Sequence, residues 1–441
     1  MWFLRYVRER KFRHVLAEQG EFYQKSRAPR DLRKWQLDQF NLQWQTIRRD
    51  VPYYQRLCGE DQLPPSFPAW REFQERMPVM DRRAVQNAQS ALMNQRRAPD
   101  FMRTTGGSTA EPVQIPAWRS EINFATKDIW YARSWYGVSP ADKLFLLWGH
   151  SHLLGKGLRG RINGVRRALL DSLLGYYRHS AYDLSEPGLR EAAEALLEFG
   201  PAYVVGYAVA LDRFSRINRD RRERFHRLKL KVAIATAESF PGPDSALLIG
   251  DVLGCPVAME YGSVETGPIA HQKPDGHYSV FWRHYFLEGR ESTEVPGAYE
   301  LFLTSLYPRC FPLVRYKLGD LISTNPDGKD FSQEFEAVIG RCNDCVILRN
   351  GGVVHSEAFT HAVKEISSIL GYQVVQSPDG AISLRYLAAK RLEPSDVEEI
   401  VRRLNRVNPY LSGVRVERVD SLEQTIAGKT RRIVRQPQFT P

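Results

Sequence analysis

Between about residues 100 and 340, short apolar segments alternate with amphipathic ones, and this alternation constrains the fold of the chain most. Lys143–Trp148, Ala202–Val205 and Lys231–Thr236 have the length and the composition of buried β-strands. Ser120–Tyr136 and Leu189–Phe199 have the periodicity of amphipathic helices. Alternation of strands and helices predicts an α/β architecture, with functional groups at the carboxyl ends of the strands.

The length of 441 residues and one change in composition predict two domains. A polar stretch that contains a proline and a glycine, Asn325–Glu336, reads as a linker, and the predicted helix Glu357–Leu370 follows it. We expect a large N-terminal multi-layer α/β domain over residues 1–338, with a helical start at 1–60. We expect a small mobile C-terminal α+β domain over residues 339–441.

Charge and cysteine usage restrict the compartment and the partners. The chain has 62 Lys and Arg against 51 Asp and Glu, a formal charge of +11, which favours acidic partners. No apolar run approaches the roughly 18 residues of a membrane-spanning helix. No small-residue cleavage site follows the apolar start, so export is not expected. Five scattered cysteines indicate a reducing compartment, and we expect a cytoplasmic protein.

Three basic segments are candidates for binding. The basic amphipathic start at Met1–Leu16 suits either contact with an anionic membrane or packing on its own domain, and the pattern favours packing. Gly149–Arg167 is rich in glycine and cations, which favours a mobile solvated loop over a site for a phosphorylated co-substrate. Arg216–Lys231 lacks the interleaved aromatic residues of a nucleic-acid site and reads as a solvated helix face.

Asp81 is a candidate N-cap of the helix that leads toward residues 102–113.

A loop rich in hydroxyl groups and glycines lies at Met102–Val113. Four hydroxyl side chains and two glycines fall within the six residues Thr104–Thr109. Glycines let the backbone approach an anion, and hydroxyl groups add donors without charge, so the loop suits nucleotide phosphates. Neither the GxxxxGK[ST] motif nor the GxGxxG motif is present.

Later segments carry groups that suit a nucleotide and its metal ion. Tyr261 precedes Gly262, so an aromatic ring can lie against a purine where the backbone passes close by. Glu265, three residues beyond that glycine, can hold Mg²⁺. Asp320 follows a glycine and can accept hydrogen bonds from both ribose hydroxyls. Lys429 on a glycine-flanked loop can reach an α-phosphate.

In this order, the segments resemble the motifs of the adenylate-forming, or acyl-CoA synthetase, superfamily. The resemblance is greatest to the phenylacetate–CoA ligase branch and to CapK-type proteins of capsular polysaccharide synthesis. It implies ATP-dependent, AMP-forming activation of a carboxylic acid and acyl transfer to coenzyme A, with ATP and Mg²⁺ required. The nucleotide-binding residues that it implies are Thr105, Gly107, Ser108, Thr109, Ala237, Glu238, Tyr261, Gly262, Asp320 and Arg341. It also implies Glu265 as the Mg²⁺ ligand and Lys429 with Glu265 as catalytic residues.

Departures from the family pattern leave alternatives open. Ala110, Glu111 and Asn343 replace residues usual in the family, so a non-catalytic binding protein on this fold is one alternative. Transfer to an amine or hydroxyl of a sugar precursor is another. A homodimer and a polyanion- or membrane-binding protein also stay open.

Two further groups of side chains are candidate sites. A zinc site could use Cys342 and Cys345, with His271, Cys310 and His277 as further candidate ligands. Buried or reactive thiols are the favoured interpretation. The acid-binding pocket is expected to take an apolar or aromatic acid. The residues that suggest this are Val204, Val205, Tyr207 and Phe240.

Overall fold

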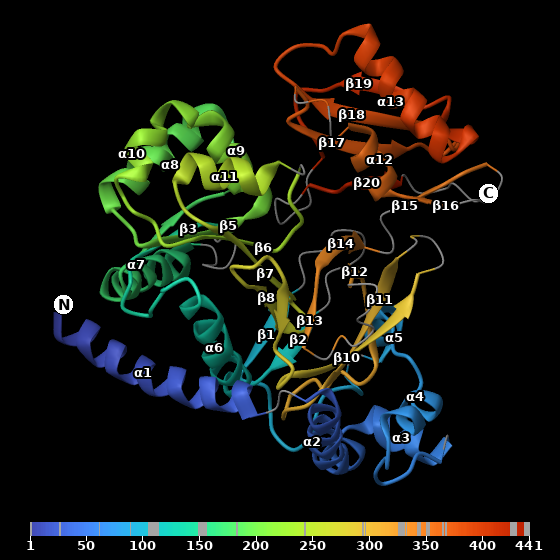
Figure 1. Ribbon diagram of the computed structural model, residues 1–441. Helices are drawn as coiled ribbons and strands as arrows, with labels where there is room; N and C mark the ends of the chain where they lie inside the picture. Colours follow the sequence, from blue (N-terminus) through green and yellow to red (C-terminus); the bar gives the residue numbers. More distant parts are fainter. Residues whose placement is uncertain are drawn as a thin grey trace.

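The computed structural model describes most of the chain (Figure 1). The described residues are 2–25, 28–60, 62–88, 90–104, 114–148, 157–181, 184–241, 244–292, 295, 297–324, 331, 333–341, 345–349, 353–363, 366, 368–423 and 430–435.

Within these residues, the largest sheet has eight strands in the order β13-β9-β8-β7-β6-β5-β3-β4. The strands from β4 to β7 are parallel, and β8, β9 and β13 continue the sheet antiparallel. The strands are β3 Leu144–Leu147, β4 Tyr176–His179, β5 Tyr203–Tyr207, β6 Ala233–Thr236, β7 Val257–Ser263, β8 Gly267–Gln272, β9 Tyr278–Val280 and β13 Glu334–Phe335. The predicted α/β fold is therefore confirmed.

Helices cover both faces of this sheet. Figure 1 shows α8 to α11 on one side and α1, α6 and α7 on the other. Their bounds are α1 Trp2–Lys25, α6 Arg119–Ser134, α7 Gly157–Leu174, α8 Glu186–Phe199, α9 Ala208–Ile217, α10 Arg222–His226 and α11 Ser245–Leu253. Helix α8 begins where the Ser185 side chain accepts a hydrogen bond from the Gly188 amide at 3.3 Å. It ends at Gly200, which adopts the left-handed backbone (φ 58°) that glycine favours.

A second, antiparallel sheet of order β10-β11-β12-β14 packs beside the remaining N-terminal helices. Its strands are β10 Tyr285–Glu291, β11 Ala298–Ser305, β12 Tyr316–Ser323 and β14 Ala337–Arg341, and the helices are α2 Pro29–Asp50, α3 Pro52–Glu60, α4 Trp70–Arg76 and α5 Arg82–Asn87. Trp70 of α4 stacks on Phe286 of β10 with ring centroids 3.5 Å apart. Asp81 caps α5 as predicted, because its carboxylate accepts from the Ala84 amide at 2.8 Å.

The C-terminal residues form a third, mixed sheet of order β19-β18-β17-β20 with two helices. Its elements are β17 Gly371–Gln376, β18 Ile382–Leu387, α13 Pro394–Val407, β19 Arg415–Arg418 and β20 Ile433–Arg435, next to β15 Cys345–Ile347, β16 Val353–His355 and α12 Ser356–Val363. The buried apolar side chains from Val346 to Ile433 form a cluster of their own. The two-stranded sheet of β1 Phe101–Thr104 and β2 Gln114–Ala117 flanks the hydroxyl-rich loop.

Two expectations need correction. The segment Gly149–Arg167 is not a loop throughout, because helix α7 starts at Gly157, whereas residues 149–156 lie outside the described part. The glycines of this segment favoured a loop prediction, although its apolar residues recur every three to four positions, as in a helix, as far as Leu174. The predicted helix Glu357–Leu370 ends early, at Val363.

The basic run Arg216–Lys231 is mostly solvent-exposed, as predicted, but it is not one helix face: it covers the end of α9, a 3-10 turn at Arg219–Arg221, helix α10 and the turn that follows. Several of its arginines form ion pairs with carboxylates of the same helix or of neighbouring segments. These pairs are Arg216 with Asp212 and Asp244, Arg221 and Arg224 with Glu194, and Arg222 with Asp251. A surface neutralised in this way offers little to a polyanion. In the described part of the chain, no helix is both long and apolar enough to cross a bilayer.

Candidate active site

Strand β7 and the turn that joins it to β8 present three of the predicted residues, Tyr261, Gly262 and Glu265. Gly262 lies at a β-bulge of β7, where an added Cβ would stand 2.3 Å from the carbonyl oxygen of Gly267. Only glycine fits such an approach of two backbones. Ser263 and Thr266 close the turn, since each backbone amide donates to the other's hydroxyl at 3.1–3.2 Å. The turn holds Glu265 in a fixed position.

Tyr261 and Asp320 meet although they belong to different sheets. The Tyr261 hydroxyl donates to Asp320 Oδ2 at 2.7 Å, and both residues are only 8% exposed. Asp320 lies opposite Arg341 in the register of β12 and β14. The fold thus brings three sequence-predicted positions together, although the Arg341 side chain lies outside the described part.

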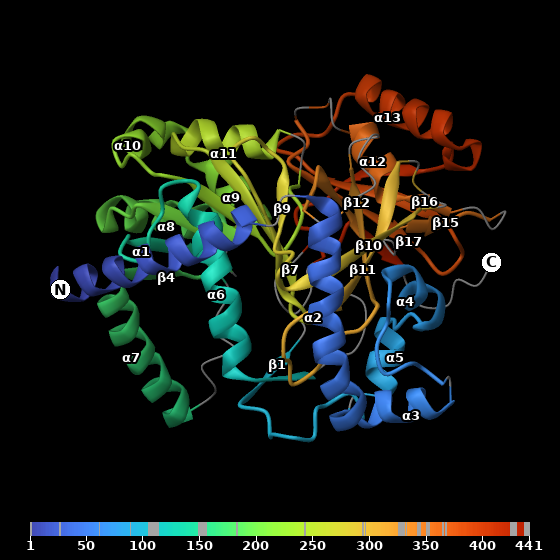
Figure 2. The ribbon, with the colours of Figure 1, turned by 60° about the horizontal axis from the view of Figure 1, so that its bottom comes forward.

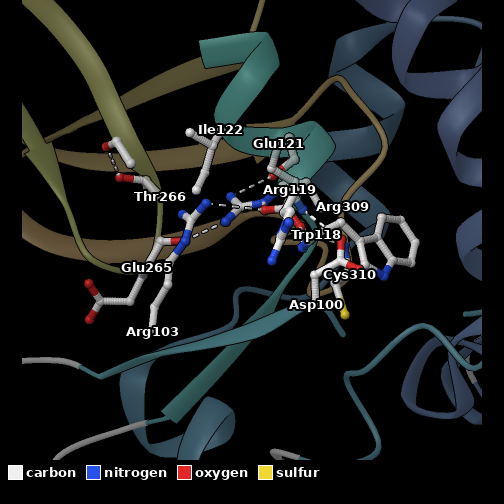
Figure 3. Close-up of polar contacts among 12 residues, drawn as sticks. Asp100, Arg103, Trp118, Arg119, Glu121, Ile122, Glu265, Thr266, Arg309 and Cys310 are labelled. Carbon is white, nitrogen blue, oxygen red and sulfur yellow. Dashed lines mark hydrogen bonds and ion pairs between the residues drawn. The ribbon is translucent and has the colours of Figure 1, made fainter. Parts of the chain in front are cut away.

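The Glu265 side chain and backbone have separate partners. Its carboxylate is 3.3 Å from the Arg82 guanidinium of α5. Its carbonyl oxygen accepts a hydrogen bond from Arg309 Nη2 at 2.5 Å. Figure 3 shows the Glu265 carboxylate pointing away from Arg103 and from Arg309, which holds the backbone. The backbone is therefore anchored on one side while the carboxylate faces the other.

A buried cluster of charges that sequence reasoning missed supports this arrangement (Figure 3). Glu121 is 1% exposed, and its Oε1 accepts from the Trp118 and Cys310 amides at 2.9 and 3.0 Å. Its Oε2 lies 3.4 Å from Arg309 and 3.6 Å from Arg103. Arg103 directly precedes Thr104, so the cluster reaches the start of the hydroxyl-rich loop.

Arg309 stays charged inside this cluster. Burial alone would lower its pKa, but Tyr307, Tyr285 and Glu121 outweigh that effect and raise the pKa above the ordinary value. The one sequence signal was a charged residue within an apolar run that ends at Leu313. Removing either member of such a buried pair leaves an uncompensated charge, which costs about 3–5 kcal/mol.

Ala237 and Glu238 leave the end of β6. Ala237 has the left-handed φ of 72°, which is unfavourable for a residue with a Cβ, so the surrounding structure must impose it. Glu238 Oε1 accepts from the Val209 amide at 3.2 Å, in the first turn of α9. The Glu238 carboxylate therefore helps to fix a helix N-terminus next to the strand ends.

The C-terminal part of the chain reaches the same region through Arg432, directly before β20. The Arg432 guanidinium donates to the carbonyl oxygens of Phe240 and of Pro241, the latter at 3.0 Å. The buried Gln373 amide donates to the carbonyl oxygens of Glu423 and Arg431 at 3.1 and 3.0 Å. Gln373 thus joins the two ends of the segment that contains Lys429.

Several predicted residues lie outside the described part of the chain. They are Thr105, Gly107, Ser108, Thr109, Ala110, Glu111, Cys342, Asn343 and Lys429. The roles assigned to them stay predictions, as does the zinc alternative at Cys342 and Cys345. Among the described residues, no group of three or more His, Cys, Asp or Glu side chains is placed to hold a metal ion.

The side chains expected to line the acid-binding pocket do not all lie in one apolar cluster. Val204 and Val205 pack into different apolar clusters, so they do not line one pocket together. Consecutive residues of a strand point to opposite faces, which explains the separation. Tyr207 lies against Trp148 with ring centroids 4.4 Å apart, and Phe240 is partly buried where Arg432 contacts it.

Comparisons with known proteins identify the fold. A crystal structure of 2-hydroxyisobutyryl-CoA ligase with 2-HIB-AMP in the postadenylation state has a TM-score of 0.70 and 17% identity. The match covers 92% of this chain and 90% of that chain. Amide bond synthetase McbA from Marinactinospora thermotolerans has a TM-score of 0.53 and 17% identity, over 75% of this chain and 67% of that chain.

One curated relative extends the similarity over nearly the full length. Protein CapK of Staphylococcus aureus is 20% identical over 443 aligned positions, which cover 97% of this chain and 93% of CapK. No family model matches the chain. The chain therefore has the fold of adenylate-forming ligases, as the motif order predicted.

Proposed function

We propose that this chain, with the fold of an adenylate-forming ligase, uses ATP to convert an organic carboxylic acid into an acyl adenylate. The observation that carries the proposal is the buried hydrogen bond between Tyr261 and Asp320, with Glu265 on the adjoining turn. An aromatic ring, a carboxylate for sugar hydroxyls and a carboxylate for a metal ion are the groups that ATP needs.

The nucleotide is held by groups from both N-terminal sheets. The Tyr261 ring lies against the adenine, next to the backbone of Gly262 and of Ala237-Glu238. Asp320, which the Tyr261 hydroxyl orients, accepts hydrogen bonds from the ribose hydroxyls. The loop with Thr105, Gly107, Ser108 and Thr109 holds the phosphates, and Arg341 lies on the strand beside Asp320.

Mg²⁺ fits the donor set at Glu265. Its carboxylate is oriented away from the buried cluster and lies close to the Arg82 guanidinium, and Mg²⁺ commonly binds one or two carboxylates together with substrate phosphates. When bound, Mg²⁺ neutralises phosphate charge. Arg309 holds the Glu265 backbone and thereby keeps the carboxylate in place.

Lys429 is the proposed catalytic cation. It lies three residues before Arg432 in the sequence, and the Arg432 guanidinium donates to the carbonyl oxygens of Phe240 and Pro241. An ammonium at this place stabilises negative charge on the α-phosphate as the acid attacks. We propose that the part of the chain after β14 forms the mobile domain that delivers it and that the part up to Arg341 binds the substrates, because the expected boundary at residues 338 and 339 falls inside β14, which pairs with β12. The separate apolar cluster from Val346 to Ile433 supports this division.

Coenzyme A is the proposed acceptor of the acyl group. The 2-hydroxyisobutyryl-CoA ligase that this chain resembles over 92% of its length supports it. An amine or hydroxyl of a sugar precursor is the second candidate, supported by the full-length similarity to CapK and by the amide bond synthetase. Product analysis with each acceptor separates the two.

ATP–pyrophosphate exchange across a panel of carboxylic acids tests the proposal. We expect exchange that depends on one class of acid and falls by about a hundredfold or more in Lys429→Ala. Arg431→Ala, which removes a neighbouring cation but keeps the carbonyl that Gln373 contacts, should retain the exchange. Binding of ATP without exchange for any acid would contradict turnover and favour a non-catalytic binding protein.

A further inference from the structure

Helix α7 exposes an apolar stripe that nothing in the described part of the chain covers. The exposed fractions are 63% for Val165, 63% for Leu169, 49% for Leu170, 54% for Leu173 and 36% for Leu174. Tyr177, just beyond the helix, is 38% exposed. Isolated exposed apolar residues are ordinary, but a run of them along one helix marks an interaction surface.

The N-terminal part of α1 continues this surface. Arg8 Nη1 donates to the carbonyl oxygen of Leu174 at 2.9 Å, so α1 meets the C-terminal end of α7. Tyr6 and Val7, in the same turn of α1, are 47% and 44% exposed. Figure 2 shows α7 projecting from the molecule on the side where α1 begins.

The charges on this surface are predominantly positive. Arg10, Lys11 and Arg13 of α1 are exposed, as is Arg166 of α7. Among the described side chains, residues 6–14 and 165–174 together have six Lys and Arg against two carboxylates, Glu9 and Asp171. Asp171 forms an ion pair with Arg178 at 2.6 Å, so its charge is compensated.

We propose that α7 and the start of α1 dock the protein on a membrane surface that contains anionic lipids. An amphipathic helix with leucines on one face and arginines beside them lies in the plane of the interface, with its apolar face among the acyl chains. The cations meet lipid headgroups. A second copy of this chain would place the same cations against each other, so charge favours the membrane. The inference does not depend on the proposed catalytic activity.

Co-sedimentation of the full chain with phosphatidylcholine vesicles, with and without phosphatidylglycerol, tests the proposal. We expect binding to the anionic vesicles that weakens with salt. A variant with both Leu169→Glu and Leu173→Glu should bind at least about tenfold more weakly. Leu247→Glu is the matched control, since Leu247 is 79% exposed on α11, away from the stripe, and should bind like the unmodified protein.

A second variant and a second measurement keep the test independent of folding. Arg10→Gln with Lys11→Gln should weaken binding to anionic vesicles by about fivefold for each charge and leave the apolar stripe intact. Equal thermal unfolding midpoints would show that all variants are folded. Equal sedimentation of all variants would overturn the proposal. A vesicle-independent dimer that the leucine variant dissociates would also overturn it, because the stripe would then join two copies.

Discussion

Replacing Tyr261 by Phe removes one hydroxyl and leaves the ring, so it tests whether Asp320 is held for the ribose. The hydroxyl donates at 2.7 Å to a carboxylate, with both residues only 8% exposed. Hydrogen bonds to charged groups contribute about 1.5–3 kcal/mol. If that energy serves to orient Asp320, kcat/KM for ATP should fall by about 10- to 150-fold.

ATP–pyrophosphate exchange at varied ATP concentration measures the change, and urea unfolding measures stability in parallel. Tyr278→Phe is the matched control, because Tyr278 is also buried and both tyrosine rings contact Phe335, with ring centroids 6.0 Å apart for Tyr261 and 4.9 Å apart for Tyr278. The control should keep the ATP dependence of the unmodified protein. An unchanged kcat/KM in Tyr261→Phe would refute the assignment of Asp320 to the nucleotide.

Three further substitutions follow from the structure. Gly262→Ala places a Cβ 2.3 Å from a carbonyl oxygen of the opposite strand, so a lower urea midpoint and weaker ATP binding are expected; an unchanged protein would show that the bulge is not needed. Arg309→Met leaves the buried Glu121 carboxylate without its nearer cation and should cost about 3–5 kcal/mol in urea unfolding. A decrease in the free energy of unfolding of less than about 1 kcal/mol would contradict this, because exposed ion pairs contribute that little. Burial lowers the pKa of His271, so the native state binds this proton less readily than the unfolded chain. Its contribution to stability should be complete above about pH 6.5 and decrease as the pH falls below that value. His271→Gln should lack this decrease, whereas the exposed control His277→Gln should retain it.

The α/β fold was predictable because its strands are short apolar runs with clear boundaries. Ala233–Thr236 and Leu144–Leu147 lie within the segments predicted from composition alone. The helix in Gly149–Arg167 was missed because glycine is a poor helix former, although the apolar period is intact. Local propensity and periodicity disagreed there, and periodicity was correct.

The contacts within the site were less predictable than the residues that form it. Tyr261 and Asp320 are 59 positions apart and lie on different sheets, so no local pattern indicates that they form a hydrogen bond. The amide of Cys310 and the carboxylate of Glu121 are 189 positions apart. Buried charges find their partners through tertiary packing, which leaves no periodic trace in the sequence.

Detection of the acyl adenylate by mass spectrometry tests the central claim most directly. The protein is incubated with ATP, Mg²⁺ and a mixture of carboxylic acids without an acyl acceptor. We predict an acyl-AMP of one acid class that is absent with Lys429→Ala and present with Arg431→Ala. ATP that is bound or hydrolysed without any acyl-AMP would contradict the account.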